Sequence, residues 1–497
     1  MAGSSVSGRL ISASGIDGGW SFVNIANLLG RDGLALVSGA DCPSAVSECR
    51  RGARGRPRTG IYRRYAERAQ RLLPGQEAMA EDGRAVVERL WSEVFGASTR
   101  VGATASGPAP PADLQGGGSC CSWVGDGWAR HSLQTRAIAL SLARAGLLRP
   151  PAAGLLTTVE FGAADAELSK QVADATAGAG GAGGSGGGAE PVHLRQILVD
   201  RVPGPCSGAA FDEYAASTGT CACSDGPSTE PERLTIDIAD LDLPSVLGVA
   251  AAPGGTVIGM AKHLCGAGTD LAVRAMLSVA EAHPTAELSV GVAIVGCCHE
   301  LCEWRSCSQA SQEFFASHGI MPEDQRDGGG SGGGGGFQLL CEAAGSTAAI
   351  YRQITAAAAA AASEVAAVLG EADTESVALA AERAAALAIS EAIQQASGAE
   401  PLEKSDDLAE AAAVVPMGVS RGEVAEIALA AARGVAASQA DALRVALKAR
   451  RLLDESRRRA LIDAGFEATL SVIVSSAVSV DNTLLLAHRP AAAATGD

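Results

Sequence analysis

Residues 256–277 read TVIGMAKHLCGAGTDLAVRAML, an apolar run that passes through Lys262, His263 and two glycines into a helix-like stretch. A second apolar run follows and ends in CCHELC at residues 297–302. Alternation of this kind is typical of parallel α/β sheets, in which strands and helices take turns along the chain. Because open α/β sheets bind ligands at the carboxyl ends of their strands, the histidines, the thiols and the lysine mark the expected ligand-binding edge.

The same alternation extends on both sides of this stretch. The expected strands are Leu156–Phe161, Gln196–Val199, Leu234–Ile238, Thr256–Ala261 and Leu288–Val295. Right-handed crossovers between them would give a parallel sheet that is covered on both faces. Near the end of the chain, residues 450–466 predict a helix, and residues 467–487 predict two strands joined by a short turn. We therefore expect an α/β sheet of seven strands with a terminal antiparallel hairpin.

Composition divides the chain into parts. Tracts rich in glycine occur at 102–118, 177–188 and 328–336, and such tracts are flexible. Alanine-rich sequence from about 355 to 445 has high helix propensity but only a thin apolar stripe. The expected parts are a divergent, partly disordered region at 1–127, the first part of the α/β core at 128–320, a mostly helical Gly/Ala-rich insertion at 321–444, and the second part of the core at 445–497.

Cysteine usage and the lack of a signal peptide indicate the cellular compartment. The 497 residues include 13 cysteines without a signal-peptide pattern, which favours reduced thiols in the cytosol or nucleus. The serine- and glycine-rich start of the chain leaves import into an organelle open. The apolar stretch Ala356–Ala362 is much too short to span a membrane, so no membrane partner is expected.

The net charge of −17 argues against indiscriminate binding to nucleic acid but permits a local basic patch. One basic run extends from Arg50 to Arg71 and a second from Arg444 to Arg459. Clustered cations of this kind can bind phosphate backbones, because counterions are released on association. A solvated helix face or, for the first run, a disordered arm explains the same pattern.

Acidic residues and a glycine follow the first three expected strands. Glu160 and Gly162 lie at the turn after the first strand, where helix amides can face a cofactor, although ordinary tight turns also use glycine. Asp200 ends the second strand, where an acid can bind ribose hydroxyls or cap a helix. After the third strand, either Asp237 or Asp240 could meet an adenine amino group.

The fourth and fifth strands end in the residues with the most chemistry. Lys262 and His263 are expected to face the ligand edge, whereas Asp270 is expected to cap the following helix. Cys297, Cys298, His299 and Cys302 are soft ligands within six residues, but their spacing is not a usual zinc motif. Thiols of this kind can equally line a pocket wall.

These motifs resemble a specific family, the eukaryotic tRNA 2′-O-methyltransferases that modify the ribose of acceptor-stem nucleotide 4. The resemblance is carried, in order along the chain, by Glu160–Ala164, Leu198–Arg201, Lys262–Leu271, Cys297–Trp304, Leu453–Arg457 and Ser479–Ala487. It implies a Rossmann-like methyltransferase sheet, S-adenosylmethionine as cofactor and the tRNA acceptor stem as partner. It also implies that Lys262 orients the ribose hydroxyl and that His263 or His299 accepts its proton. Glu160, Gly162 and Asp200 would then hold the cofactor, with Asp237 or Asp240 nearer the adenine.

The chain departs from the family pattern at three positions. Ala164 and Ala166 replace glycines of the first turn, and Glu300 replaces the second histidine of a CCHH segment. These departures motivate one alternative, a relative that binds RNA but no longer transfers methyl groups. A nicotinamide-dependent oxidoreductase is the second alternative, although the first turn lacks G-x-G-x-x-G. Zinc is not supported by a complete motif.

Overall fold

The computed structural model describes most of the α/β core and three long helices of the insertion. The described residues are 81–96, 127–148, 155–164, 166–181, 193–201, 231–248, 254–283, 288–322, 335–369, 374–397, 419–474, 479 and 481–491. The basic run Arg50–Arg71 lies outside them, as does Asp165 in the first turn.

A seven-stranded mixed sheet forms the centre of the fold, in the order β3-β2-β1-β4-β5-β7-β6. The strands are β1 (Leu155–Phe161), β2 (His193–Asp200), β3 (Glu232–Thr235), β4 (Thr256–Cys265), β5 (Ser289–Cys297), β6 (Glu467–Val472) and β7 (Thr483–Arg489). The first five run parallel, and β7 pairs antiparallel with both β5 and β6. The α/β class, the strand number and the terminal hairpin expected from the sequence are thus confirmed.

The third strand differs from its expected position, because it ends at Thr235 rather than at Ile238. Asp237 accepts a hydrogen bond from the amide of Ala239 and so begins the short 3-10 helix η4 (Ile238–Asp240). An aspartate that caps a helix favours a local turn over continued strand pairing. Leu234, Ile236 and Ile238 pack partly buried against the core, so the apolar pattern predicted the contact with the core but not the conformation of the segment.

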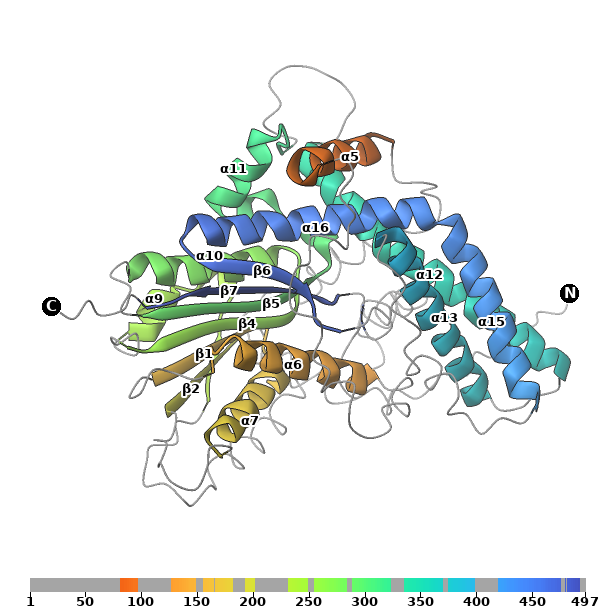
Figure 1. Cartoon of the computed structure of the whole chain (residues 1–497), viewed down its shortest axis with the longest axis horizontal. Coiled ribbons are helices and arrows are strands. Elements are labelled where there is room, and N and C mark those ends of the chain that lie inside the picture. The colour runs from red at the N-terminus through yellow and green to blue at the C-terminus, as the bar shows by residue number, and fades with distance from the viewer. Residues whose placement is uncertain are drawn as a thin grey trace, which may run out of the picture.

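Helices cover both faces of the sheet (Figure 1). On one face, α9 (Leu243–Leu247), α10 (Ala267–Ala282) and the end of α16 (Ala440–Asp463) pack on the strands. On the other face, α6 (Gly127–Arg144) and α7 (Glu167–Gly181) bury a separate apolar cluster. Valine and isoleucine fill the central strands, as is typical of parallel strands that are buried on both sides.

A third apolar cluster lies beside the sheet, around α16. It joins α5 (Glu81–Phe95), α11 (Gln309–Ser317) and the start of α12 (Gly336–Leu369) through Trp91, Phe315 and Phe337. The rings of Phe315 and Phe337 pack edge to face, with centroids 5.3 Å apart. The first turns of α12 therefore belong to the core, although the sequence placed them in the insertion.

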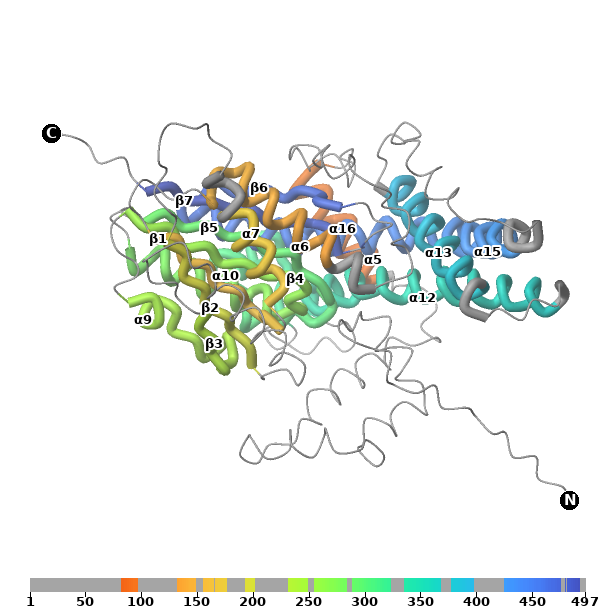
Figure 2. Tube along the Cα trace, turned by 90° about the horizontal axis from the view of Figure 1, so that it is seen from below, coloured from red at the N-terminus to blue at the C-terminus, as the bar shows by residue number. Residues whose placement is uncertain are grey.

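The rest of the insertion forms a helical arm that projects from the sheet (Figures 1 and 2). It consists of α12 beyond its first turns, α13 (Thr374–Ser397), α15 (Val419–Ser438) and the start of α16. Its interior is mostly alanine, with isoleucines such as Ile354 and Ile389 between the helices. None of the described helices is both long and apolar enough to cross a membrane.

Candidate active site

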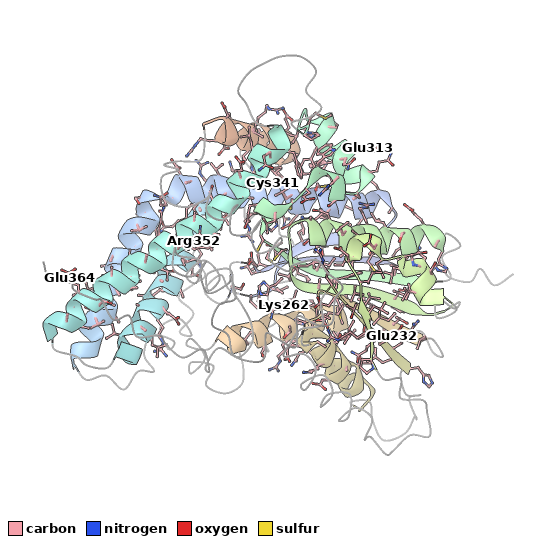
Figure 3. The ribbon with its side chains drawn as sticks, turned by 180° about the vertical axis from the view of Figure 1, so that it is seen from behind. Glu232, Lys262, Glu313, Cys341, Arg352 and Glu364 are labelled. Carbon is pink, nitrogen blue, oxygen red and sulfur yellow. The ribbon has the colours of Figure 1, made fainter. Side chains whose placement is uncertain are left out.

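The candidate active site lies at the carboxyl ends of the parallel strands, where β4 carries Lys262 and His263. The pairing of β4 with β5 is regular up to Lys262 and shifts before Leu264, so His263 sits in a local irregularity with φ of 56°. Irregularities of this kind re-aim a side chain at a strand end. Figure 3 shows Lys262 at the end of the sheet that faces the helical arm.

His263 is held by residues from two distant parts of the chain. Its Nε2 atom lies 2.9 Å from Oε1 of Gln134 on α6, and the Gln134 amide nitrogen donates to the carbonyl of Asp481 at 2.6 Å. Because the Gln134 amide nitrogen donates elsewhere, its oxygen is the acceptor, and we assign the proton to Nε2 of His263. The Nδ1 atom, 4.0 Å from the Asp481 carboxylate, then carries the lone pair.

Burial lowers the pKa of His263, although the Asp481 carboxylate raises it in part and Lys262 lowers it further. The imidazole is therefore neutral at neutral pH. A neutral imidazole with a lone pair on one nitrogen is able to accept a proton.

Three thiols lie close together next to Lys262 and His263. Cys265 and Cys297 are the last residues of β4 and β5, they are opposite one another in the sheet, and their Sγ atoms are 3.4 Å apart. Hydrogen bonds from Cys297 and Cys298 lower the pKa of Cys265, and the same contacts with Cys265 raise the pKa of its two neighbours. Cys265 belongs to the KHLCG segment, and its contact with Cys297 agrees with the expectation that the thiols of the two segments lie at one edge of the sheet.

His299 lies in a different environment from His263. Its side chain is 2% exposed, and its Nε2 atom is 2.9 Å from Oδ1 of Asp454 on α16. The same carboxylate oxygen accepts a hydrogen bond of 2.8 Å from Arg457, whose other nitrogens donate to both carboxylate oxygens of Asp270. Burial lowers the pKa of His299, while Asp454 raises it. His299 is thus part of a buried ionic network.

This network also changes the expected role of Asp270. The sequence predicted that Asp270 caps α10, but the N-cap is Gly266, and no side chain caps it by a hydrogen bond. Asp270 instead forms the bidentate pair with Arg457, at 2.8 and 3.0 Å. The cap prediction was wrong because the partner comes from a helix 187 residues further along the chain.

The first turn is tied together by its acidic residues. Gly162 has φ of 69°, and a Cβ placed on it would lie 3.2 Å from Cδ1 of Leu264 at the end of β4. Glu160 is buried and accepts hydrogen bonds from the amide and hydroxyl of Ser169, at 2.9 and 2.5 Å. Asp200 accepts a hydrogen bond of 2.9 Å from the amide of Ala164. Both carboxylates therefore stabilise the conformation of the turn through hydrogen bonds.

The acids after β3 serve as helix caps in part. Asp237 caps η4 and lies 3.5 Å from Nε of Arg201, whereas Asp240 is exposed within η4. The next acid along the chain, Asp242, caps α9 through the amide of Ser245. Since β2 and β3 are neighbours, Asp200, Asp237 and Asp240 still lie near one edge of the sheet.

Most of the basic residues of α16 form ion pairs with acidic residues of the protein. Lys448 and Arg444 pair with Glu88 on α5, and Arg458 and Arg459 pair with Glu455. Arg450 pairs with Asp481, and Arg457 lies in the buried network. Lys448, Arg450 and Arg457 are thereby mostly buried, whereas Arg444 and Arg459 are each 39% exposed, so phosphate binding by the exposed part of this run stays a prediction.

Gln134, Asp454 and Asp481 are functional candidates that the sequence reasoning did not single out. Gln134 is 129 residues from His263, and Asp454 is 155 residues from His299. No local spacing can reveal such pairs. Asp481 lies within the terminal hairpin segment VDNTLLLA, which is the one available signal.

The fold and these residues define an α/β protein whose candidate active site lies at the carboxyl ends of β1, β2, β4 and β5. Residues 133–326 match the family described as Methyltransferase TRM13.

Three curated relatives are each named tRNA:m(4)X modification enzyme TRM13. The relative from Eremothecium gossypii is 33% identical over 182 residues, which is 35% of this chain and 37% of the relative. Those from Schizosaccharomyces pombe and Scheffersomyces stipitis are 35% and 30% identical over 19% and 20% of this chain, and 23% and 24% of their own lengths. The chain thus aligns with less than two fifths of each relative, and no solved structure matches it significantly.

Proposed function

We propose that this chain is an S-adenosylmethionine-dependent tRNA methyltransferase that modifies the ribose 2′ oxygen of acceptor-stem nucleotide 4. The observation that carries the proposal is the contact between the Gly162 turn and the end of β4, which puts a cofactor turn beside Lys262 and His263 in the segment that matches the family. The strand order supports a Rossmann-like methyltransferase sheet. A cytosolic or nuclear location belongs to the same proposal, as does a methyltransferase core of residues 128–320 and 445–497, against which α5 and the first turns of α12 pack.

The first turn fits a bound nucleoside cofactor in its backbone. Gly162 adopts a positive φ, which glycine tolerates, and a Cβ on it would press against Leu264, so the glycine keeps the turn close to the end of β4. Glu160, Gly162 and Asp200 would hold the cofactor, with Asp237 or Asp240 near the adenine. When bound, S-adenosylmethionine supplies an electrophilic methyl carbon on a positively charged sulfur.

In the proposed reaction, the residues at the end of β4 act on the ribose hydroxyl. The ammonium group of Lys262 orients the hydroxyl and stabilises the negative charge that develops on its oxygen. The neutral imidazole of His263 accepts the proton at Nδ1, while the Nε2–H group donates to Gln134. His263 suits this step better than His299 does, because His299 is buried and paired with Asp454.

One observation favours the alternative of a binding protein without methyl transfer. Ala164 and Ala166 have φ of 41° and 60°, the left-handed region that favours glycine. Ala164 is exposed, and its methyl group stands where the family has none, so it would keep the cofactor away from the turn; Ala166 is buried against Ala163 and Leu198. The alternative predicts tRNA binding without binding of S-adenosylmethionine.

The test measures transfer of a radiolabelled methyl group to total tRNA by the full chain. Loss of electrostatic stabilisation is worth about 10²–10³ in rate, so Lys262→Ala should lower transfer by that factor. Arg274→Ala removes an exposed cation on α10 and serves as the matched control, for which no change is expected. His263→Gln should lower transfer by about 10²–10⁴.

The position and atom are tested with a tRNA whose fourth nucleotide carries a 2′-deoxy sugar. The proposal expects no label in that substrate and normal label in the unmodified tRNA. Persistent labelling would refute the ribose assignment. Absence of transfer to either substrate, together with retained tRNA binding, would favour the alternative.

A further inference from the structure

The three thiols at the ends of β4 and β5 have the geometry of a metal site. The Sγ atoms of Cys265, Cys297 and Cys298 all lie within 4.8 Å of one another, and two of them are 3.4 Å apart. Around tetrahedral zinc, with Zn–S bonds of about 2.3 Å, sulfur atoms are about 3.8 Å apart. Shifts of at most about 1 Å would therefore place these sulfurs on one ion.

The backbone explains how two consecutive cysteines reach the same point. Successive side chains of a strand point to opposite faces, so Cys297 and Cys298 would diverge if the strand continued. Cys298 instead adopts the left-handed conformation, with φ of 48° and ψ of 49°. A non-glycine residue in this conformation costs roughly 1–2 kcal/mol, and strain of this kind is concentrated at functional sites.

The other described cysteines do not share this arrangement. Cys302 lies against Arg457, Cys307 donates to the carbonyl of Glu303, and Cys341 donates to the carbonyl of Cys302. These three are buried, whereas Cys265 and Cys298 are partly exposed, so an ion could enter. Although Cys297 is buried too, its sulfur lies with those of Cys265 and Cys298, and this convergence separates the three from the packing thiols.

A second set of ligand atoms, from His263, Cys297 and Asp481, also lies within 4.8 Å. It is the weaker candidate because the Asp481 carboxylate already pairs with Arg450. Thiolates are soft ligands that select zinc over magnesium or calcium, which favours the three-cysteine set.

We propose that Cys265, Cys297 and Cys298 bind one zinc ion as thiolates, with water in the fourth position. Binding replaces three thiol protons, which pass to solvent, by one divalent ion and involves no oxidation. The ion would join the ends of β4 and β5 and so fix the backbone three residues after Lys262. The zinc proposal is tested independently of the proposed function, because the experiment measures metal content and not methyl transfer.

The test measures zinc in the full chain, purified under reducing conditions without chelator and supplied with zinc. Cys265→Ala is expected to contain one equivalent less than the unaltered protein. The matched control is Cys341→Ala, a buried cysteine outside the set, which should keep the full zinc content. This difference excludes any contribution from the cysteines outside the described residues.

Cobalt substitution identifies the ligands. The unaltered protein should show the thiolate-to-cobalt charge-transfer absorption and the visible bands of a tetrahedral site, and Cys298→Ala should weaken both. Equal zinc contents in Cys265→Ala and Cys341→Ala would overturn the proposal. It would also be overturned if the unaltered protein bound no zinc, or if intact-mass analysis after reducing purification showed a disulfide between Cys265 and Cys297.

Discussion

Replacing the two alanines of the first turn by glycine is predicted to affect the stability of the protein differently at the two positions. Both Ala164 and Ala166 have a positive φ, which costs an L-residue about 1–2 kcal/mol. The strain at Ala164 persists because its amide donates to Asp200 and its carbonyl accepts from Arg233. Replacing either alanine by glycine removes the strain but increases the entropy of the unfolded chain, at a cost of about 0.4–1 kcal/mol.

Burial decides the difference between the two substitutions. Ala164 is exposed, so its methyl group contributes no packing, and Ala164→Gly should stabilise the protein by about 0.5–1 kcal/mol. Ala166 is 0% exposed, and loss of its methyl group removes about 0.8 kcal/mol of apolar burial. The three effects then nearly cancel, so Ala166→Gly should change stability by less than about 0.8 kcal/mol in either direction.

Thermal unfolding of the full chain measures both effects. For a domain of 150–250 residues, 1 kcal/mol shifts Tm by about 2–4 °C, so Ala164→Gly should raise Tm by about 1–4 °C. Ala239→Gly is the matched control, because Ala239 is exposed and has an ordinary φ, and it should lower Tm. A decrease of Tm in Ala164→Gly, or an equal increase in both turn variants, would refute the strain argument.

Three further predictions concern the buried network and the close contact beside it. Arg457→Leu leaves Asp270 and Asp454 buried without their cation, so urea denaturation should show a loss of about 3–5 kcal/mol, and a loss below about 1 kcal/mol would contradict the pairing. In Gly266→Ala, the new Cβ would lie 2.4 Å from the carbonyl carbon of Leu301 at φ of +46°, so Tm should fall, and an unchanged Tm would disprove the contact. Burial lowers the pKa of His299, so below about pH 6.5 the unfolded state binds a proton that the folded state does not. Stability should then decrease as pH falls from 7 to 5; His299→Gln should flatten that decrease, and an unaltered slope would show that His299 does not cause it.

The sequence predicted the strands that are buried on both faces, because continuous runs of valine and isoleucine have no other common explanation in an α/β chain. It predicted β1, β4 and β5 to within a few residues of their observed starts. The predicted third strand was too long. Apolar residues such as Leu234 and Ile238 fit a strand and a turn equally well, and only the cap by Asp237 decides between the two.

The site was predictable only where its residues are local in sequence. Lys262 and His263 lie near the carboxyl end of β4, and their place at the ligand edge follows from the topology of parallel sheets. The partners Gln134 and Asp481 come from other parts of the chain, and the orientation of His299 toward α16 depends on the left-handed turn at Cys298. Such turns are not visible in composition or periodicity.

The boundary of the insertion can be tested by deletion, because α12 serves two apolar clusters. Phe337, Leu340 and Ala344 pack with Trp91 and Phe315 in the cluster beside the sheet. The arm beyond Ile350 has an interior of its own, formed with α13 and α15. The composition-based boundary at 321–444 therefore cuts through the core.

Two shortened chains test whether the insertion begins at residue 321 or beyond Ile350. Replacing residues 352–438 by a short Gly/Ser linker should leave the sheet and the cluster around Trp91 intact, with a Tm close to that of the full chain. Removing residues 321–444 also deletes the aromatic packing of Phe337, whose burial is worth about 1.5–3 kcal/mol on its own, and should lower Tm clearly further. Equal Tm values for the two shortened chains would show that the first turns of α12 contribute nothing to the core.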